Sequence, residues 1–153
     1  MSHAPVVTYD DLCARVSGLM TSMDRAPVIG ISGHGGAGKS TLAARLMSDL
    51  GGTPEQVIGT DTLYAVGAGP CSGLFDLHDW PALFELLHRL RTTKDPKRLS
   101  YSARAYSGAE RAHDVPMPPV VIVEGIRLLR PETMARTRSS RAKISAARSN
   151  SGP

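Results

Sequence analysis

The chain has 153 residues, of which 41% are hydrophobic and 21% are charged, and this suits one globular domain of about 100–150 residues. No stretch approaches the roughly 20 apolar residues of a membrane helix, and the N-terminus lacks the basic and apolar regions of a signal peptide. The two cysteines, Cys13 and Cys71, stand outside any CxxC pattern. We therefore expect a cytoplasmic protein with reduced thiols and no membrane partner.

The formal net charge of +4 comes from the end of the sequence. Residues 131–153 contain five Lys or Arg residues and one Glu, whereas positive and negative residues balance over 1–130. A basic segment can bind nucleic acid or an anionic membrane. This one lacks aromatic residues that would stack on bases, and Ser, Arg and Ala dominate it after Met134. We expect a disordered tail over 136–153 rather than a nucleic-acid site.

The first part of the chain predicts a helix, a strand, a loop and a second helix. Apolar residues at helical spacing follow a capping box at 8–11, and Pro27 ends that helix. The apolar run 28–31 predicts a buried parallel strand. A glycine-rich loop follows directly, and the next helix begins near Lys39 and ends at 51–52.

The remainder continues the alternation. Residues 57–59 predict a short strand, 65–73 a glycine-rich loop, and Asp79 the N-cap of a third helix. The segment 94–119 is polar and broken by four prolines, so we expect a loop there. Residues 120–123 form the clearest buried strand. This order predicts an α/β fold with a mainly parallel sheet.

The segment 33–40, GHGGAGKS, satisfies the phosphate-loop pattern G-x-x-x-x-G-K-[ST]. Glycines let the backbone wrap around phosphates, and successive N–H groups at a helix N-terminus form an anion site. Lys39 would reach the β- and γ-phosphates of ATP, and the Ser40 hydroxyl would bind Mg²⁺. His34 stands at a variable position, so we expect it to face solvent without a catalytic role. The predicted nucleotide-binding residues are Gly33, Gly35, Gly36, Ala37, Gly38, Lys39, Ser40 and Thr41.

Two acidic residues stand at predicted strand ends, where α/β folds gather their ligands. Asp61 follows the strand at 57–59, and Glu124 follows the strand at 120–123. Carboxylates there can hold Mg²⁺ or accept a proton from an attacking hydroxyl. The alternatives are a turn or N-cap aspartate at Asp61 and a solubilising charge at Glu124.

Together these segments resemble the uridine kinase-like P-loop kinases of the phosphoribulokinase and uridine kinase family. GISGHGGAGKST, GTDTLY, LFDLHDW and VIVEGIRLL occur in the order and approximate spacing of that family, over about residues 26–130. The resemblance implies a three-layer α/β/α P-loop NTPase fold. It also implies an ATP- and Mg²⁺-dependent kinase that acts on a hydroxyl of a nucleoside, similar to uridine or cytidine, or of a related small metabolite.

The resemblance also implies roles for individual residues. Asp61 is similar to the aspartate that activates the acceptor hydroxyl, and Glu124 to the Walker B acid that holds Mg²⁺ with Ser40. Tyr106 stands where nucleoside kinases carry a pyrimidine-reading histidine, which argues against uridine itself. The implied catalytic residues are Lys39 and Asp61, and the implied substrate-binding residues are Tyr64, Asp76, Tyr101 and Tyr106.

The sequence departs from the family after the EGI segment. Such kinases continue with a further strand and an arginine-rich lid, whereas no strand or lid-helix pattern follows Met134 here. We expect an incomplete kinase domain over 1–135, produced by truncation or a frame change near 135–137. A missing strand would leave a sheet edge unpaired, which favours aggregation or pairing with another chain, including a homo-oligomer.

The sequence is compatible with two functions. The first is a kinase with a small-molecule acceptor, and the second is an ATP-binding module without useful turnover because the lid is missing. A GTPase is disfavoured by the lack of an NKxD motif, and an ABC-type ATPase by the lack of an LSGGQ-like motif.

Overall fold

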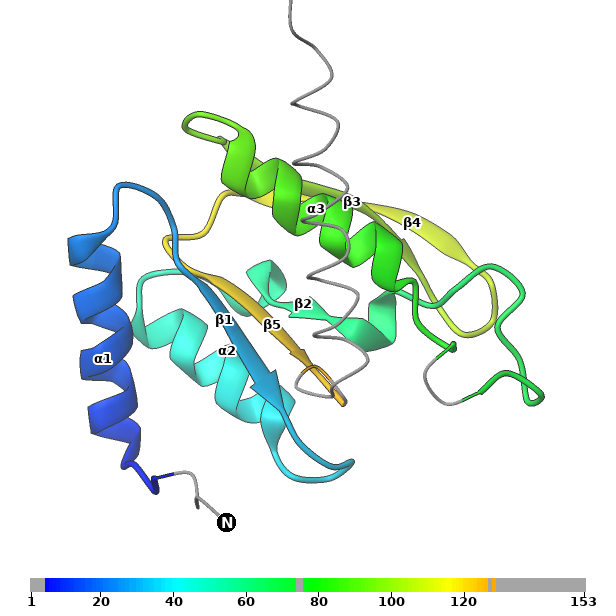
Figure 1. Cartoon of the computed structure of the whole chain (residues 1–153), viewed down its shortest axis with the longest axis horizontal. Helices are drawn as coiled ribbons and strands as arrows, with labels where there is room; N and C mark the ends of the chain where they lie inside the picture. The colour runs from blue at the N-terminus through cyan, green and yellow to red at the C-terminus, as the bar shows by residue number, and fades with distance from the viewer. Residues whose placement is uncertain (1–4, 74–75, 127, 129–153) are drawn as a thin grey trace, which may run out of the picture.

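The structure, a computed structural model, describes residues 5–73, 76–126 and 128. Helices, strands and two short 3₁₀ turns alternate along the chain (Figure 1). In order they are α1 (Tyr9–Ser22), β1 (Val28–Ser32), α2 (Lys39–Asp49), η1 (Pro54–Gln56), β2 (Ile58–Gly59), η2 (Thr60–Thr62), α3 (Trp80–Thr92), β3 (Arg98–Arg104), β4 (Glu110–Pro116) and β5 (Val121–Gly125).

The main sheet is parallel, with strand order β1-β5-β2. β5 pairs with β1 from Val28 opposite Val121 to Ser32 opposite Gly125, and with β2 through Gly59 opposite Glu124. The carboxyl ends of the strands therefore meet at one edge, where β1 runs into the loop before α2 (Figure 1). This confirms the predicted α/β fold with a mainly parallel sheet.

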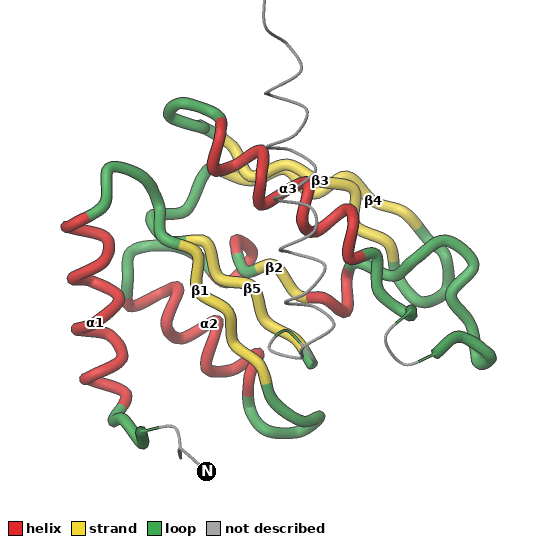
Figure 2. The backbone as a smooth tube through the Cα atoms, in the orientation of Figure 1, coloured by secondary structure: helices red, strands yellow, loops and turns green. Residues whose placement is uncertain are grey.

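Alternate side chains of β5 enter two separate cores, one on each face of the sheet. The α1/α2 core contains Val16, Ala43, Leu46, Met47, Val120 and Ile122. The α3/hairpin core contains Ile58, Leu63, Trp80, Leu83, Leu86, Leu90, Leu99, Val121 and Val123. Because β5 lies between them, the described residues form three layers, with α1 and α2 on one face and α3 with the β3–β4 hairpin on the other (Figure 2).

The predicted loop over 94–119 is wrong in part, because it contains an antiparallel hairpin. β3 and β4 pair in register from Arg98 opposite Pro116 to Arg104 opposite Glu110. Pro96 precedes the hairpin, Pro116 is the last residue of β4, and Pro118 and Pro119 follow it, so no proline interrupts the ladder. Leu99 and Ala103 alternate with polar residues and are buried, and this period of two is the strand signal that the proline count obscured.

The other predicted elements are confirmed, with small shifts at their ends. The Thr8 side chain accepts from the Asp11 backbone as the predicted capping box requires, and Asp79 caps α3 by accepting from the Ala82 backbone at 3.0 Å. Glu124 lies within β5 rather than after it, because the pairing with β1 extends to Gly125.

Two further expectations concern the C-terminal part of the chain and the membrane-spanning potential of its helices. The end of the predicted kinase domain from residue 129 and the tail at 136–153 lie outside the described residues. No helix in the described part of the chain has the length and hydropathy of a membrane span.

Candidate active site

The phosphate loop joins β1 to α2 with the backbone geometry that its glycines permit. Gly36 and Gly38 adopt φ angles of +74° and +76°, a left-handed region that disfavours residues with a Cβ. Gly38 is also the N-cap of α2 and supplies no side-chain hydrogen bond to the first turn. The N–H groups of that turn thus remain available to an anion, and the helix dipole places positive potential there.

Lys39, the first residue of α2, bends back over the loop. Its Nζ donates a hydrogen bond of 2.7 Å to the His34 carbonyl oxygen. The ammonium therefore lies above the loop that would surround the phosphates. His34 itself is exposed, as predicted, and it contributes its backbone rather than its imidazole.

Ser40 and Glu124 come together from elements 84 residues apart in the sequence. The Ser40 hydroxyl donates to Glu124 Oε1 at 3.0 Å. Glu124 is only 7% exposed, which excludes the alternative of a solubilising charge. A hydroxyl and a carboxylate oxygen at this spacing suit Mg²⁺, a hard cation that binds few protein oxygens and keeps several waters. Within the described ranges, no cluster of three or more His, Cys, Asp or Glu side chains suggests a different metal.

Asp61 lies in η2, directly after β2, and shares the same sheet edge. A Cβ built on Gly59 would clash with Asp61 Oδ1 and lie 3.5 Å from Glu124 Oε1. Both carboxylates therefore approach the bare Cα of Gly59, which pairs with Glu124 across the sheet. Asp61 is exposed to solvent, so an acceptor hydroxyl could reach it.

Two of the predicted acceptor-side tyrosines meet each other beyond Asp61. The Tyr64 ring contacts the Tyr106 ring edge-on at a centroid distance of 5.3 Å. The Tyr64 amide donates to the Arg104 carbonyl at 3.1 Å, which holds this segment against the end of β3. The hairpin therefore forms one wall of the region next to Asp61.

Tyr101 belongs to the same wall, further along β3. Burial raises the pKa of its hydroxyl and the nearby negative charge of Asp61 raises it further, whereas a hydrogen bond with Thr62 lowers it. The hydrogen bond places the Tyr101 hydroxyl at Thr62, the residue that directly follows the predicted catalytic aspartate Asp61.

Asp76 is the fourth predicted substrate-binding residue. Among the described residues, no hydrogen bond or ring contact links its side chain to the three tyrosines. It is exposed, and its amide donates to the Gly73 carbonyl at 2.8 Å. The next residue, Leu77, accepts from the Ala65 amide at 2.9 Å, so this segment runs beside Tyr64. Asp76 is therefore next in sequence to a residue that contacts the Tyr64 segment. Its role in substrate binding stays a prediction.

Sequence reasoning missed two histidines whose rings contact site tyrosines in a tilted arrangement. His78 is 7% exposed and lies 5.1 Å from the Tyr64 ring, and His113 lies 4.6 Å from the Tyr101 ring. His78 falls within the quoted LFDLHDW segment, where its position next to Asp79 gave no distinct signal. His113 could have been found only from the hairpin, because the β3–β4 register places it opposite Tyr101.

Comparison with known proteins supports this fold. No protein-family model and no curated protein matches the sequence. Among solved structures, a possible uridine kinase from Bacillus stearothermophilus matches with a TM-score of 0.53 and 21% identity, over 80% of this chain and 75% of that one. A proposed fructose transport system kinase from a Silicibacter species matches with a TM-score of 0.58 and 26% identity, over 81% of this chain and 66% of that one.

The chain thus has the fold of P-loop kinases of the uridine kinase type. It spans just under two thirds of the length of the second of these structures.

Proposed function

We propose that the protein is a kinase that transfers the γ-phosphoryl group of ATP to a hydroxyl group of a nucleoside or a related small metabolite. The observation that carries this proposal is the hydrogen bond between Ser40 and Glu124 at the end of the phosphate loop. It joins the helix that would bind the phosphates to the central strand, at the edge where Asp61 also lies. An ATP-consuming reaction and two free cysteines suit a cytoplasmic protein.

The nucleotide would bind with its phosphates over the loop and the N-terminus of α2. Lys39 would exchange its bond with the His34 carbonyl for the β- and γ-phosphate oxygens, a stronger charge-assisted contact. Ser40 and Glu124 would hold Mg²⁺, which neutralises charge on the transferring group. Thr41 follows Ser40 in the first turn of the same helix and can donate to the phosphates.

In the transfer step, the Asp61 carboxylate accepts the proton of the acceptor hydroxyl. The acceptor oxygen then forms a bond to the γ-phosphorus, and the bond from that phosphorus to the β–γ bridging oxygen breaks. The bridging oxygen keeps the electron pair, so ADP leaves as an anion. In-line attack requires the acceptor to lie on the far side of the γ-phosphate from ADP, which is the side that Asp61 would occupy.

The acceptor side favours a compact, hydroxylated molecule. Tyr64, Tyr101 and Tyr106 contribute aromatic surface and hydroxyl groups, which suit a sugar ring or a planar base. The names of the two structural neighbours point to a nucleoside in one case and to a sugar in the other. Both classes therefore belong in an acceptor screen.

The experiment is ADP release with ATP and Mg²⁺ in the presence of single nucleosides and sugars. We expect release that depends on one acceptor class and falls at least about 100-fold in Asp61→Asn, which keeps the side-chain size but cannot accept the proton. Binding of ATP should be nearly unchanged in that variant. If Asp61→Asn retained full acceptor-dependent activity, the assignment of the base would be wrong.

A nucleotide-binding module without phosphoryl transfer is the second candidate. One observation favours it: Asp61 is exposed, and within the described part of the chain no hydrogen bond fixes its carboxylate. The same screen decides between the two. Tight ATP binding without ADP release in the presence of any acceptor would support the module and contradict the kinase.

A further inference from the structure

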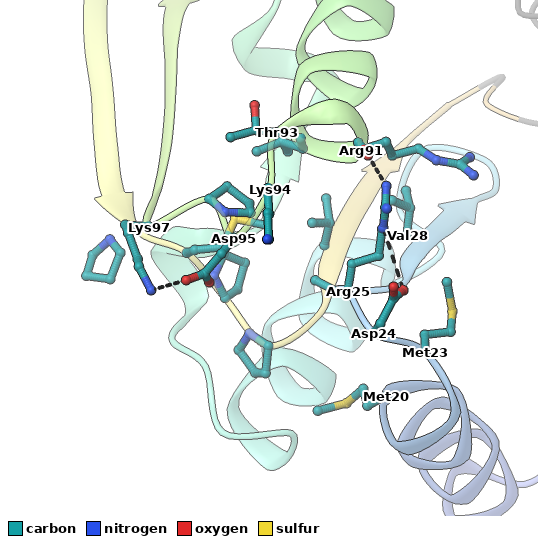
Figure 3. A pocket seen from close by; sticks show the side chains of 18 residues that line it. Met20, Met23, Asp24, Arg25, Val28, Arg91, Thr93, Lys94, Asp95 and Lys97 are labelled. Carbon is teal, nitrogen blue, oxygen red and sulfur yellow. Dashed lines mark hydrogen bonds and ion pairs between the residues drawn. The ribbon is translucent and has the colours of Figure 1, made fainter.

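A cavity lies at the opposite end of the main sheet from the phosphate loop. Its volume is about 730 Å³, which is within the range of about 300–1,000 Å³ for small-molecule sites. It is bounded by the chain entering β1, the connection from α3 to β3 and the connection from β4 to β5 (Figure 3). Val28 and Val121, the first residues of β1 and β5, line it. The five residues of β1 therefore separate it from the phosphate loop by about 13 Å.

The walls of this cavity are apolar and rich in methionine. Met20 and Met23 come from the end of α1, and Met117 comes from the connection before β5. Met23 and Val28 remain 41% and 39% exposed, although Val28 begins a strand of the main sheet. Methionine side chains adapt to ligands of irregular shape, which makes such a surface suited to an apolar molecule. We refer to this cavity, with Met20, Met23, Met117, Val28, Arg25 and Lys94 in its lining, as the methionine pocket.

The rim of the methionine pocket carries an excess of positive charge. Both of its acidic residues are already engaged, Asp24 with Arg25 at 3.7 Å and Asp95 with Lys97. Arg25 also donates to the carbonyl oxygen of Arg91 at the C-terminal end of α3. Two cations of the lining, Lys94 and Arg91, have no ion-pair partner among the described residues. The Lys94 side chain extends into the space between Asp95 on one side and Val28 and Arg25 on the other, whereas the Arg91 side chain extends away from Lys94 (Figure 3).

We propose that the methionine pocket binds a small molecule that joins an apolar body to one anionic group, with Lys94 as the partner of the anion. The charge of the pocket complements such a ligand, and the exposed methionine and valine side chains supply the apolar surface that it would cover. The end of this chain has the wrong charge to serve as that ligand, because residues 131–153 carry five basic residues and one Glu. The site is distinct from the proposed nucleotide site and does not depend on kinase activity.

The test uses decanoate below its micelle-forming concentration as the probe and the full chain with ¹³C-methyl methionine. We expect the methyl signals of Met20, Met23 and Met117 to shift together as decanoate is added. Met47 belongs to α2, is fully buried in the α1/α2 core and serves as an internal control whose signal stays in place. Decanol, which has the same carbon chain without the charge, should bind about tenfold more weakly.

Four variants locate the anion contact. Lys94→Glu should raise the dissociation constant of decanoate by at least about tenfold, and Lys94→Arg should preserve binding. Arg15→Glu makes the same change of charge at an exposed residue of α1 outside the pocket, and it should leave the dissociation constant within about twofold. Lys39→Ala should also leave it unchanged, because the phosphate loop lies at the other end of the sheet.

Three results would overturn the proposal. Equal binding of decanol and decanoate would remove the role of charge, and equal weakening by Lys94→Glu and Arg15→Glu would remove the role of Lys94. A shift of Met47 together with the other methyl groups would indicate general loosening of the fold. The dispersed methyl spectrum of each variant reports its folding, and Lys94→Gln gives a milder change should Lys94→Glu not fold.

Discussion

At the scale of single residues, the candidate site depends on side chains that hold one another before any ligand binds. Lys39 is held by a backbone carbonyl, and Ser40 is held by Glu124. Such contacts reduce the entropy lost on binding, because the charged and polar groups already lie near the positions where phosphate and metal would meet them.

Replacing Lys39 by alanine should weaken ATP binding without unfolding the protein. The variant loses a charge-assisted contact to the phosphates, which corresponds to a rise in the dissociation constant of about tenfold to a hundredfold. Calorimetric titration with ATP measures it, and a thermal melt checks the fold. Lys97→Ala removes a cation that pairs with Asp95 and should bind ATP normally. Equal affinities of the two variants would contradict the predicted role of Lys39.

Replacing Glu124 by glutamine should separate metal binding from nucleotide binding. The amide can still accept the hydrogen bond from Ser40, but it lacks the charge that attracts Mg²⁺. We expect the Mg²⁺ concentration for half-maximal ATP binding to rise about tenfold, while binding without Mg²⁺ stays the same. Glu85→Gln, on the exposed side of α3, is the matched control. An unchanged Mg²⁺ dependence in Glu124→Gln would place the metal elsewhere.

At the scale of elements, the sequence predicted the helices, loops and strands that are specified by residues close together in the chain. The capping box at Thr8 and Asp11, the phosphate loop and the apolar run of β5 are each specified by neighbouring residues, and each is found where it was predicted. The positions of Lys39, Ser40 and Glu124 follow from the same motifs, because parallel strands deliver their carboxyl ends to one edge.

The β3–β4 hairpin could not be predicted in the same way. Its strands are polar on one side, and its stability depends on contacts with α3 and with the main core rather than on local propensity. The ring contact of His113 with Tyr101 follows from the hairpin register, so it was missed with the hairpin. Long-range pairing therefore limits what the sequence can show about the acceptor side of the site.

The exposed side of this hairpin should make its stability sensitive to acid. Hydrogen bonds from Arg98 and Ser100 hold the pKa of Asp114 below its ordinary value. The folded state therefore favours the ionised carboxylate, and the stability from this contact is present above about pH 4 and is lost as the pH falls through the lowered pKa. Asp114→Asn should lower the free energy of unfolding at neutral pH, and its difference from the parent protein should shrink in acid.

Urea unfolding at several pH values measures that difference, and NMR titration of the carboxyl carbon measures the pKa directly. Arg98→Ala serves as the matched variant, because it should raise the pKa of Asp114 toward its ordinary value without removing the carboxyl group. A difference in unfolding free energy that stayed constant from neutral pH into strong acid would contradict the proposed contribution of the ionised side chain.

At the scale of the whole molecule, β5 connects two cores that otherwise consist of different elements. Ile122, with Val120 just before the strand, enters the α1/α2 core, and Val121 and Val123 enter the α3/hairpin core. The same strand carries Glu124 to the candidate site at one end and lines the methionine pocket at the other. A substitution that destabilises one core should therefore also lower the stability of the other, because the shared strand cannot unfold on one face alone.

The single tryptophan of the chain allows this coupling to be measured. Trp80 is 1% exposed in the α3/hairpin core, whereas Leu46 is fully buried in the α1/α2 core. Leu46→Ala should lower the free energy of unfolding by about 2–5 kcal/mol, because it leaves a cavity between α2 and β5. If the molecule is one cooperative unit, the urea midpoint from Trp80 fluorescence should fall together with the midpoint from far-ultraviolet circular dichroism. Val66→Ala, at a side chain that is 80% exposed, should change both midpoints little. A fluorescence midpoint that stayed at the parent value in Leu46→Ala, while the helical signal was lost earlier, would show that the two cores unfold independently and that β5 does not couple them.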